Sequence, residues 1–279
     1  MAQGFADLHI HTNYSDGFWS PAQVVERVVA EGDLAVIAIT DHDITDGVAE
    51  TQAAAAPHGI EVVPAIEVSA SEGSRPIHIL GYFVDIDDAA FLAEQERVVD
   101  MRVERMRKMV AKLADFGIVV DMDELLAYAH RGIVGRLHLA RFIVERGVVA
   151  SLEEAFGRYL SDSGPCYVPI GSHTSKGAIE MVLQAGGVPV LAHPGTSQVD
   201  ELIPSLVSSG LRGIEAWHGA HSPEQIRYYA SLANKHGLLE SGGSDCHGPG
   251  KAEVLIGKVK LSLDIVEALR KAAGAKAAS

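Results

Sequence analysis

Short apolar runs alternate with amphipathic stretches along most of this chain. The runs are rich in Val, Ile and Leu, and between them apolar residues recur at helical spacing. Strands that alternate with helices predict an α/β protein with a parallel sheet. The expected strands span residues 5–12, 34–43, 60–71, 77–84, 188–194, 213–219 and 238–245, the last of these being the final strand of the sheet.

Two of the intervening helices have clear start signals. The segments SPAQ at 20–23 and SPEQ at 222–225 each place Ser at the N-cap, Pro at the first helical position and Gln where it completes a capping box. A further helix is expected near residues 262–273, at the end of the chain.

The stretch 88–163 breaks this alternation, because it contains helical patterns and little strand. A helical insertion between barrel strands most simply forms a cap over the barrel mouth, sharing the barrel core at its base. We therefore expect a barrel made of residues 1–87 and 164–279, with 88–163 as a helical cap subdomain. The expected cap helices are 88–116, 121–131, 136–146 and 151–160.

Nine side chains of the types that bind metals occur in six short segments, most of them at the ends of expected strands. A β/α barrel gathers its active site at the carboxyl ends of its strands. An open doubly wound sheet typically uses a Gly-rich phosphate loop, and none is apparent, so the barrel is favoured. His and carboxylate without Cys suit Mn, Zn or Fe. The nine residues are His9, His11, Asp16, His42, Glu67, His78, His193, Asp245 and His247.

The phase of the first strand supports a metal pocket. Residues i and i+2 of a strand share a face, so His9 and His11 point the same way and Leu8 and Ile10 point the other way. In a barrel this places the two histidines inside and the aliphatic side chains against the helices. An isolated HxH pair is often only structural, but nine such residues in this arrangement are difficult to explain without a metal.

The same reasoning separates Cys246 from its neighbours. Asp245 and His247 share a face, and Cys246 between them is turned away, so it is excluded as a ligand. The only other cysteine is Cys166, and two cysteines do not form a disulfide framework.

Composition limits the possible partners. The 279-residue chain is 47% apolar and has a formal net charge of −14, which argues against a protein that coats long nucleic acid. A small phosphorylated substrate remains compatible, because bound metal ions supply positive charge locally. The N-terminus lacks the features of a signal peptide and no run is long enough to cross a membrane, so a cytoplasmic enzyme without a membrane partner is expected.

The order HxH, Asp16, TDHD, Glu67, His78, AHP and SDCH resembles the PHP (polymerase and histidinol phosphatase) family of metal-dependent phosphoesterases. The resemblance implies a distorted, TIM-like β/α barrel of seven strands. It also implies up to three divalent metal ions, with Mn expected in preference to Fe or Zn. It also implies which residues hold each ion. The first ion would lie between His9, His11, Glu67 and Asp245; Glu67 would bridge to a second, held by His78 and His193; and Asp16, His42 and His247 would hold the third.

Three further segments, 135–147, 156–169 and 213–225, resemble the branch that removes the 3′-phosphate from nucleoside 3′,5′-bisphosphates. Members of this branch are also similar to 5′-to-3′ exoribonucleases that act on short RNA. The resemblance implies substrate contacts from Arg136, His138, His218 and His221. The expected reaction is attack on phosphorus by a hydroxide bridging two ions, with Glu67, Arg136 and His218 as the catalytic residues.

Other functions remain open at this point. The same barrel also suits a histidinol-phosphate or cyclic-phosphate hydrolase, an amide-bond hydrolase, or a non-catalytic metal-binding module. Asp7 and Asp43 flank ligands, and we expect them to accept hydrogen bonds from histidine N–H groups, Asp7 more than Asp43 because it shares the strand phase of His9. Metal identity, base preference, oligonucleotide use, the general acid and the oligomeric state are not determined by the sequence.

Overall fold

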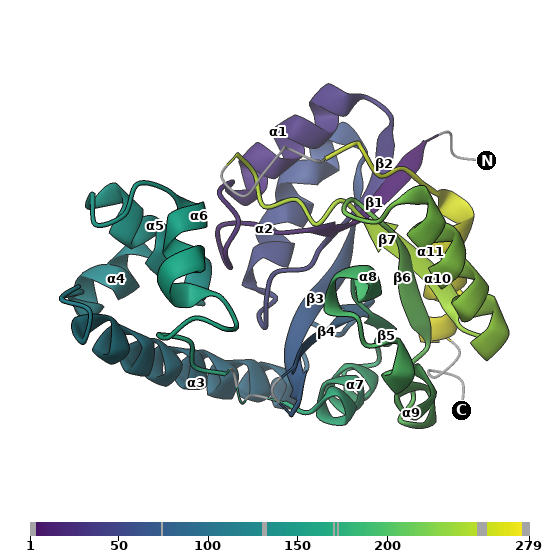
Figure 1. Ribbon diagram of the computed structural model, residues 1–279. Helices are drawn as coiled ribbons and strands as arrows, with labels where there is room; N and C mark the ends of the chain where they lie inside the picture. Colours follow the sequence, from purple (N-terminus) through teal and green to yellow (C-terminus); the bar gives the residue numbers. More distant parts are fainter. Residues whose placement is uncertain are drawn as a thin grey trace.

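A single eight-stranded sheet occupies the centre of the part of the chain that the structure describes (Figure 1). This computed structural model describes residues 4–73, 75–129, 133–169, 171, 173–249 and 256–274. The strand order is β7-β6-β5-β4-β3-β2-β1-β8. The strands are β1 (Phe5–Ile10), β2 (Leu34–Ile39), β3 (Glu61–Glu72), β4 (Arg75–Tyr82), β5 (Val188–Leu191), β6 (Gly213–His218), β7 (Leu239–Gly243) and β8 (Leu261–Ser262).

The sheet curls until the segment after β7 meets β1. The Asp245 N–H donates to the His9 carbonyl (2.8 Å), and the His11 N–H donates to the Cys246 carbonyl (3.0 Å). These bonds nearly close a barrel, which confirms the fold expected from the sequence. They also bring two segments that carry metal-type side chains, 9–11 and 245–247, next to each other.

The expectation of a parallel sheet is wrong at two places. β4 runs antiparallel to both β3 and β5, and β8 runs antiparallel to β1. β3 and β4 are separated by only two residues, and Gly73 there adopts the left-handed conformation (φ +63°). A parallel pair needs a crossover of a dozen or more residues, so this short link permits only a hairpin. β7 is also not the last strand, because β8 follows it.

Helices cover the outside of the barrel. The two predicted capping boxes are present at the starts of α1 and α10, and the helix expected at the chain end is α11. Isoleucines of β2 and valines of α1 share one hydrophobic cluster, which attaches the first helices to the sheet. These outer helices are α1 (Pro21–Glu31), α2 (Asp46–Ala55), η1 (Ala56–His58), α7 (Ser175–Gln184), η3 (Asp200–Leu202), α9 (Ile203–Ser208), α10 (Pro223–His236) and α11 (Leu263–Gly274). The short helix α8 (Pro194–Ser197) instead begins just after the end of β5, with His193 as its N-cap.

The remaining helices stand beside the barrel, with α3 running along one edge of the group (Figure 1). They enclose a hydrophobic cluster of their own, around Met106, Met109, Leu113 and Phe142. Cys166 is buried in the same cluster, so this core extends beyond residue 163. We propose that residues 88–163 form the cap subdomain. Its helices are α3 (Ala89–Ala114), α4 (Met122–Tyr128), α5 (Arg136–Glu145), α6 (Leu152–Ala155) and the π-helical turn η2 (Phe156–Leu160); the end of the expected helix 121–131 lies outside the described residues.

A small hydrophobic cluster made by Ile44, Val98 and Ile133 joins the cap to the barrel. Among the described residues, no helix combines the length and the apolar character needed to cross a membrane.

Candidate metal centre

His9 of β1 and His11, which directly follows the end of that strand, lie on the same side of the chain, as their spacing predicts. Their Nε2 atoms are 3.2 Å apart, and both side chains are buried. Leu8 and Ile10 are instead buried in two hydrophobic clusters. Cys246 packs in the same cluster as Ile10, so its thiol belongs to the core, as expected.

Glu67 of β3 is the hub of the site. Its carboxylate is buried and lies against five histidines from four other segments. Burial raises the pKa of this carboxyl, but His42, His78 and His9 outweigh that effect and hold the pKa well below its usual range. Oε2 lies 3.4 Å from His9 Nε2, 3.2 Å from His11 Nε2 and 3.1 Å from His42 Nδ1, and Oε1 lies 2.8 Å from His78 Nδ1 and 2.9 Å from His193 Nε2.

Asp245 completes one four-residue group with His9, His11 and Glu67. Its Oδ1 is 3.2 Å from His11 Nε2 and 3.5 Å from His9 Nε2. One ligand atom from each of these four residues lies within 4.8 Å of the others. The group has the same members as the set that the resemblance implies for the first ion.

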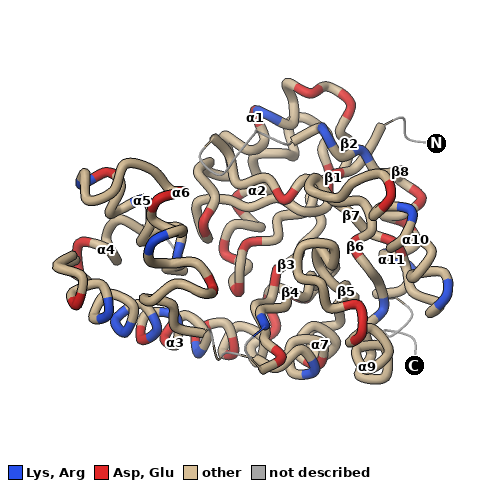
Figure 2. Tube along the Cα trace, in the orientation of Figure 1, with Lys and Arg blue, Asp and Glu red and all other residues tan. Residues whose placement is uncertain are grey.

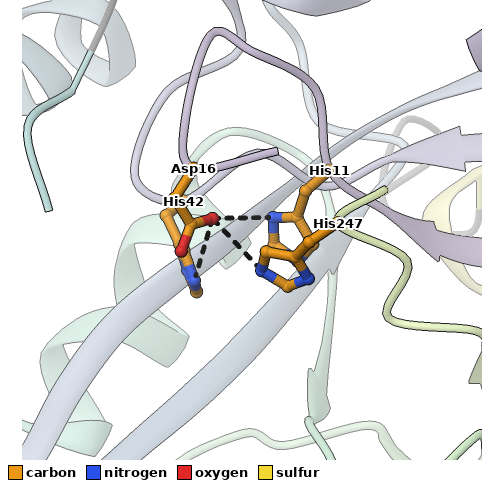
Figure 3. Close-up of side chains that lie close together, drawn as sticks. All are labelled: His11, Asp16, His42 and His247. Carbon is orange, nitrogen blue, oxygen red and sulfur yellow. Dashed lines mark ion pairs between the residues drawn. The ribbon is translucent and has the colours of Figure 1, made fainter. Parts of the chain in front are cut away.

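A second group of four surrounds Asp16 (Figure 3). Asp16 Oδ1 is 3.1 Å from His247 Nε2, 3.9 Å from His42 Nε2 and 4.0 Å from His11 Nδ1. The three side chains implied for the third ion are therefore together, and the structure adds His11 to them. His11 touches both groups through different ring nitrogens, which places the two groups side by side.

Glu67, His42 and His78 form a further group of potential ligands. His193 lies just after the end of β5, and its Nε2 contacts Oε1 of Glu67. The Oε2 atom of Glu67 and the Nδ1 atom of His42 are buried without a hydrogen-bond partner in the described part of the chain. Burial lowers the pKa of His42 well below its usual value, which keeps the ring neutral and able to coordinate. Converging carboxylate oxygens and neutral imidazole nitrogens are the donor set that Zn, Mn and Fe accept, so these residues fit divalent ions.

Glu215 of β6 is a site residue that the sequence reasoning missed. It is fully buried, its Oε1 lies 2.8 Å from His9 Nδ1, and its Oε2 accepts the His193 N–H (2.7 Å). The carboxylate thus orients one proposed ligand and holds the backbone of another. The sequence did contain a signal that could have identified Glu215: it is an acidic residue inside the otherwise apolar run GIEAWHG, and a charged side chain in such a run is buried only if it has a partner.

The orienting role expected of Asp7 and Asp43 is wrong for both. Asp7 accepts from the backbone N–H groups of Ser244 (2.8 Å) and His9 (3.4 Å), and burial raises its pKa to about 6. Asp43 accepts from the Ser69 N–H and pairs with Arg102. Among the described residues neither carboxylate bonds a histidine ring, because both support the backbone of the strand ends instead.

The histidines expected to contact substrate phosphate lie in different surroundings. His218 is buried with its Nε2 3.5 Å from Asp245 Oδ2, and its Nδ1 accepts from the Ala220 N–H (3.1 Å). His221 has both ring nitrogens engaged by backbone, one with the Ala216 carbonyl and one with the Gly195 N–H. The arrangement therefore does not support phosphate binding by His221.

His138 is buried in the first turn of α5, where its Nδ1 accepts from the Gly135 N–H (3.1 Å). This bond caps the helix that begins with Arg136. His138 is not among the residues that line the cavity described next, so its predicted substrate contact stays a prediction.

A cavity of about 390 Å³ connects the metal-type residues with the cap. One part of its wall is Asp16, His42 and His78, and another part is Arg136 with Tyr167. The Arg136 guanidinium lies 5.1 Å over the Tyr167 ring, and its Nη1 donates to Asp162 (2.7 Å). Arg136 is thus next to the space in which a phosphate bound at the metal-type cluster would lie.

A nearly closed α/β barrel with converging His, Asp and Glu side chains at its strand ends is the architecture of a metal-dependent hydrolase. Comparison with known proteins narrows this class. The model of the PHP domain matches residues 7–148, and the chain belongs to this family.

Characterised relatives cover most of the chain. It is 36% identical over 251 residues to the 3′,5′-nucleoside bisphosphate phosphatase of Chromobacterium violaceum, covering 88% of each chain. It is 34% identical to a 5′-3′ exoribonuclease of Salmonella typhimurium, covering 87% of this chain and 85% of the relative. It is 32% identical to a phosphoribosyl 1,2-cyclic phosphate 1,2-diphosphodiesterase of Eggerthella lenta, and the match covers 87% of this chain and 94% of the relative.

Two solved structures share the fold over nearly the whole chain. A protein of Bifidobacterium adolescentis assigned to the metal-dependent phosphoesterases superposes with a TM-score of 0.87 at 32% identity, covering 98% of this chain and 97% of the other. An amidohydrolase of Chromobacterium violaceum, solved with bound sulfate and no metal, has a TM-score of 0.83 at 34% identity, covering 96% and 97%.

Proposed function

We propose that this protein is a metal-dependent phosphatase that removes the 3′-phosphate of nucleoside 3′,5′-bisphosphates, and that it also shortens oligoribonucleotides from the 5′ end. The observation that carries this proposal is the single cavity that joins the His/Asp/Glu cluster to arginines of the cap. The named activities of the phosphatase and exoribonuclease relatives support it. The chain is accordingly a phosphoric ester hydrolase acting on small phosphorylated substrates, and its cytoplasmic location stays a prediction.

We further propose three ion positions with manganese as the preferred ion. His9, His11, Glu67 and Asp245 would hold the first; His78, His193 and Glu67 the second; and Asp16, His42 and His247 the third. When bound, divalent ions supply Lewis-acid chemistry that makes water nucleophilic near pH 7 and offsets charge on phosphoryl oxygens.

The protein side chains would position the reacting phosphate and move a proton. Arg136 has its Nη1 bonded to Asp162, and its other guanidinium nitrogens have no hydrogen-bond partner among the described residues. That free edge suits a phosphate, which a planar fork binds through two parallel hydrogen bonds.

His218, which borders the cluster through Asp245 and is not among the described residues that line the cavity, would donate a proton to the leaving oxygen. Because its Nδ1 accepts from the Ala220 N–H, the neutral ring carries its proton on Nε2. Nε2 is buried without a hydrogen-bond partner in the described chain and lies 3.5 Å from Asp245, at the edge of the cluster. A proton held there is available to a substrate oxygen bound at the same place.

A phosphate-release assay tests the proposal. The protein, loaded with Mn²⁺, is offered adenosine 3′,5′-bisphosphate, adenosine 3′-monophosphate, histidinol phosphate, a 1,2-cyclic phosphate of ribose 5-phosphate and a 5′-phosphorylated RNA of a few nucleotides. The bisphosphate should give the highest kcat/KM. Preference for the cyclic phosphate would assign the chain to the activity of the Eggerthella relative instead, and preference for histidinol phosphate would likewise overturn the proposal.

A further inference from the structure

One of the proposed metal ligands, Asp16, lies on a loop and not on a barrel strand. It is in the segment between the end of β1 at Ile10 and the start of α1 at Pro21, whereas Glu67 and His78 lie within β3 and β4. The hydrogen bonds of the sheet hold a ligand that is on a strand, but a ligand on a loop depends on whatever holds the loop. The group around Asp16 (Figure 3) is therefore sensitive to the contacts of this segment.

The barrel holds the first part of the loop through Asp41. This buried carboxylate accepts the Thr12 N–H (2.7 Å), the Thr12 hydroxyl (2.6 Å) and the Ser15 hydroxyl (2.5 Å). These three bonds fix the turn that directly precedes Asp16.

The cap holds the next part of the loop through Arg141 of α5. Its Nη2 donates to the backbone carbonyl of Asp16 (2.9 Å), and its guanidinium lies 3.4 Å over the Phe18 ring. The Phe18 N–H in turn donates to the carbonyl of His247 (2.7 Å), which belongs to the same group of potential ligands as Asp16. One arginine of the cap thus bonds the segment of one proposed ligand directly and reaches a second through Phe18.

Arg141 is only 7% exposed. It is not among the described residues that line the cavity, so a contact with bound substrate does not account for it. Burying a guanidinium costs free energy unless its donors are used, and the hydrogen bond that Arg141 makes in the described chain goes to Asp16. Figure 2 shows basic positions in the cap and acidic positions on the barrel segments that face it. Arg141 is therefore part of the contact between the cap and the barrel.

We propose that Arg141 is a positioning residue for the third ion: it holds Asp16 from the cap, so the third ion position is complete only while the cap is packed against the barrel. This inference rests on the ion positions given under the proposed function. Because the effect passes through Asp16, the first and second positions do not depend on Arg141. Asp16 also lines the cavity, so the same contact links the third ion to the space between cap and barrel.

Two other effects of Arg141 predict different results. Its positive charge repels a divalent ion, and if this repulsion dominated, removing the charge would make the third ion bind more tightly. If Arg141 only packed α5 against the Phe18 ring, its removal would lower the stability of the fold and leave the number of bound ions unchanged.

The test counts ions and measures their affinity without substrate. Metal-free protein is titrated with Mn²⁺ in a calorimeter, and elemental analysis gives the ions bound per chain. The wild type should bind three ions and Asp16→Ala two. In both Arg141→Met and Arg141→Gln, whose side chains do not reach the Asp16 carbonyl, the dissociation constant of the third ion should rise by about tenfold to a hundredfold, the range for losing a group that supports a metal ligand. The other two ions should bind as in the wild type.

Arg146→Met is the matched control. Arg146 is exposed, follows the last residue of α5, lies 3.6 Å over the Phe142 ring and pairs with Glu124. The substitution therefore removes an arginine from a phenylalanine ring in the same part of the cap without touching Asp16. This variant should bind three Mn²⁺ ions with the affinities of the wild type, and loss of the third ion here as well would overturn the inference.

The double variant Asp16→Ala/Arg141→Met shows whether Arg141 acts through Asp16. Its affinity for the two remaining ions should equal that of Asp16→Ala, because the ligand that Arg141 positions is already gone. A further loss overturns the inference, as does unchanged or tighter Mn²⁺ binding in Arg141→Met and Arg141→Gln. Two ions in the wild type, or three in Asp16→Ala, also overturn it. Thermal unfolding of the metal-free proteins identifies the variants that are folded, and only these are compared.

A separate phosphate-release assay distinguishes this inference from the proposed function. If the Mn²⁺ titrations give the expected pattern but the wild type releases no phosphate from adenosine 3′,5′-bisphosphate, the proposed function fails and the role of Arg141 stands. If phosphate is released and the folded Arg141 variants bind Mn²⁺ as the wild type does, the role of Arg141 fails and the proposed function stands.

Discussion

Arg102, on the long cap helix α3, donates through its Nε to the carboxylate of Asp43 (2.8 Å), the residue next to the proposed ligand His42. Both side chains are buried, and Asp43 adopts a left-handed backbone conformation (φ 59°) that is uncommon for a residue other than Gly. The other carboxylate oxygen of Asp43 accepts the Ser69 N–H (2.6 Å). One ion pair thus joins the cap, the loop that carries His42 and the strand that carries Glu67.

Removing Arg102 should destabilise the protein strongly. Arg102→Leu leaves Asp43 buried without its counter-charge, and breaking one side of a buried pair costs about 3–5 kcal/mol. Urea denaturation followed by circular dichroism measures this change. Arg107→Leu, on an exposed position of the same helix, should stay within about 0.5 kcal/mol of the wild type. Equal stability of the two variants would show that the pair contributes nothing.

Glu67→Gln should remove bound metal and activity together. The substitution keeps the size of the side chain but replaces a charge that lies against five histidines. Elemental analysis after dialysis should find fewer divalent ions per chain, and phosphate release with Mn²⁺ should be lost. The control Glu61→Gln changes an exposed carboxylate on the same strand and should behave like the wild type. Full activity in metal-free wild-type protein would contradict the metal-dependent reaction itself.

Glu215→Gln should weaken metal binding without unfolding the barrel. The carboxylate accepts from His9 Nδ1 with one oxygen and from the His193 N–H with the other, whereas a carboxamide has a single oxygen. Loss of such a supporting bond typically costs tenfold to a hundredfold in metal affinity. Titration of the metal-free protein with Mn²⁺ measures it, with Glu240→Gln on the neighbouring strand β7 as the matched control. An unchanged dissociation constant would mean that Glu215 does not orient His9.

Gly243→Ala should weaken the closure of the barrel. A Cβ added at Gly243 would lie 2.3 Å from the backbone nitrogen of His9 and 2.4 Å from the Cβ of His9, so β7 and β1 would have to separate. Overpacking of this kind costs about 1–3 kcal/mol, and the shift of His9 should reduce metal affinity as well. Gly157→Ala provides the comparison, because nothing lies within 4 Å of its added Cβ. Identical thermal midpoints for the two variants would argue against a tight contact between the strands.

The sequence alone determined the strand-helix alternation and the side of each strand on which the polar residues lie. Both properties are local: the period of two in DLHIHT places His9 and His11 together whatever the rest of the chain does. The identity of the metal-type residues was equally local, since their chemistry resides in side chains at strand ends.

The tertiary structure decided which distant groups meet. Glu215 is 206 residues from His9 in sequence, and Arg102 is 59 residues from Asp43, so no spacing rule connects either pair. The antiparallel direction of β4 was missed because periodicity describes one strand and not the direction of its neighbour, although the short link between the expected strands 60–71 and 77–84 already indicated a hairpin. Charge and period are properties of the chain, whereas burial and partnership arise only when the chain has folded.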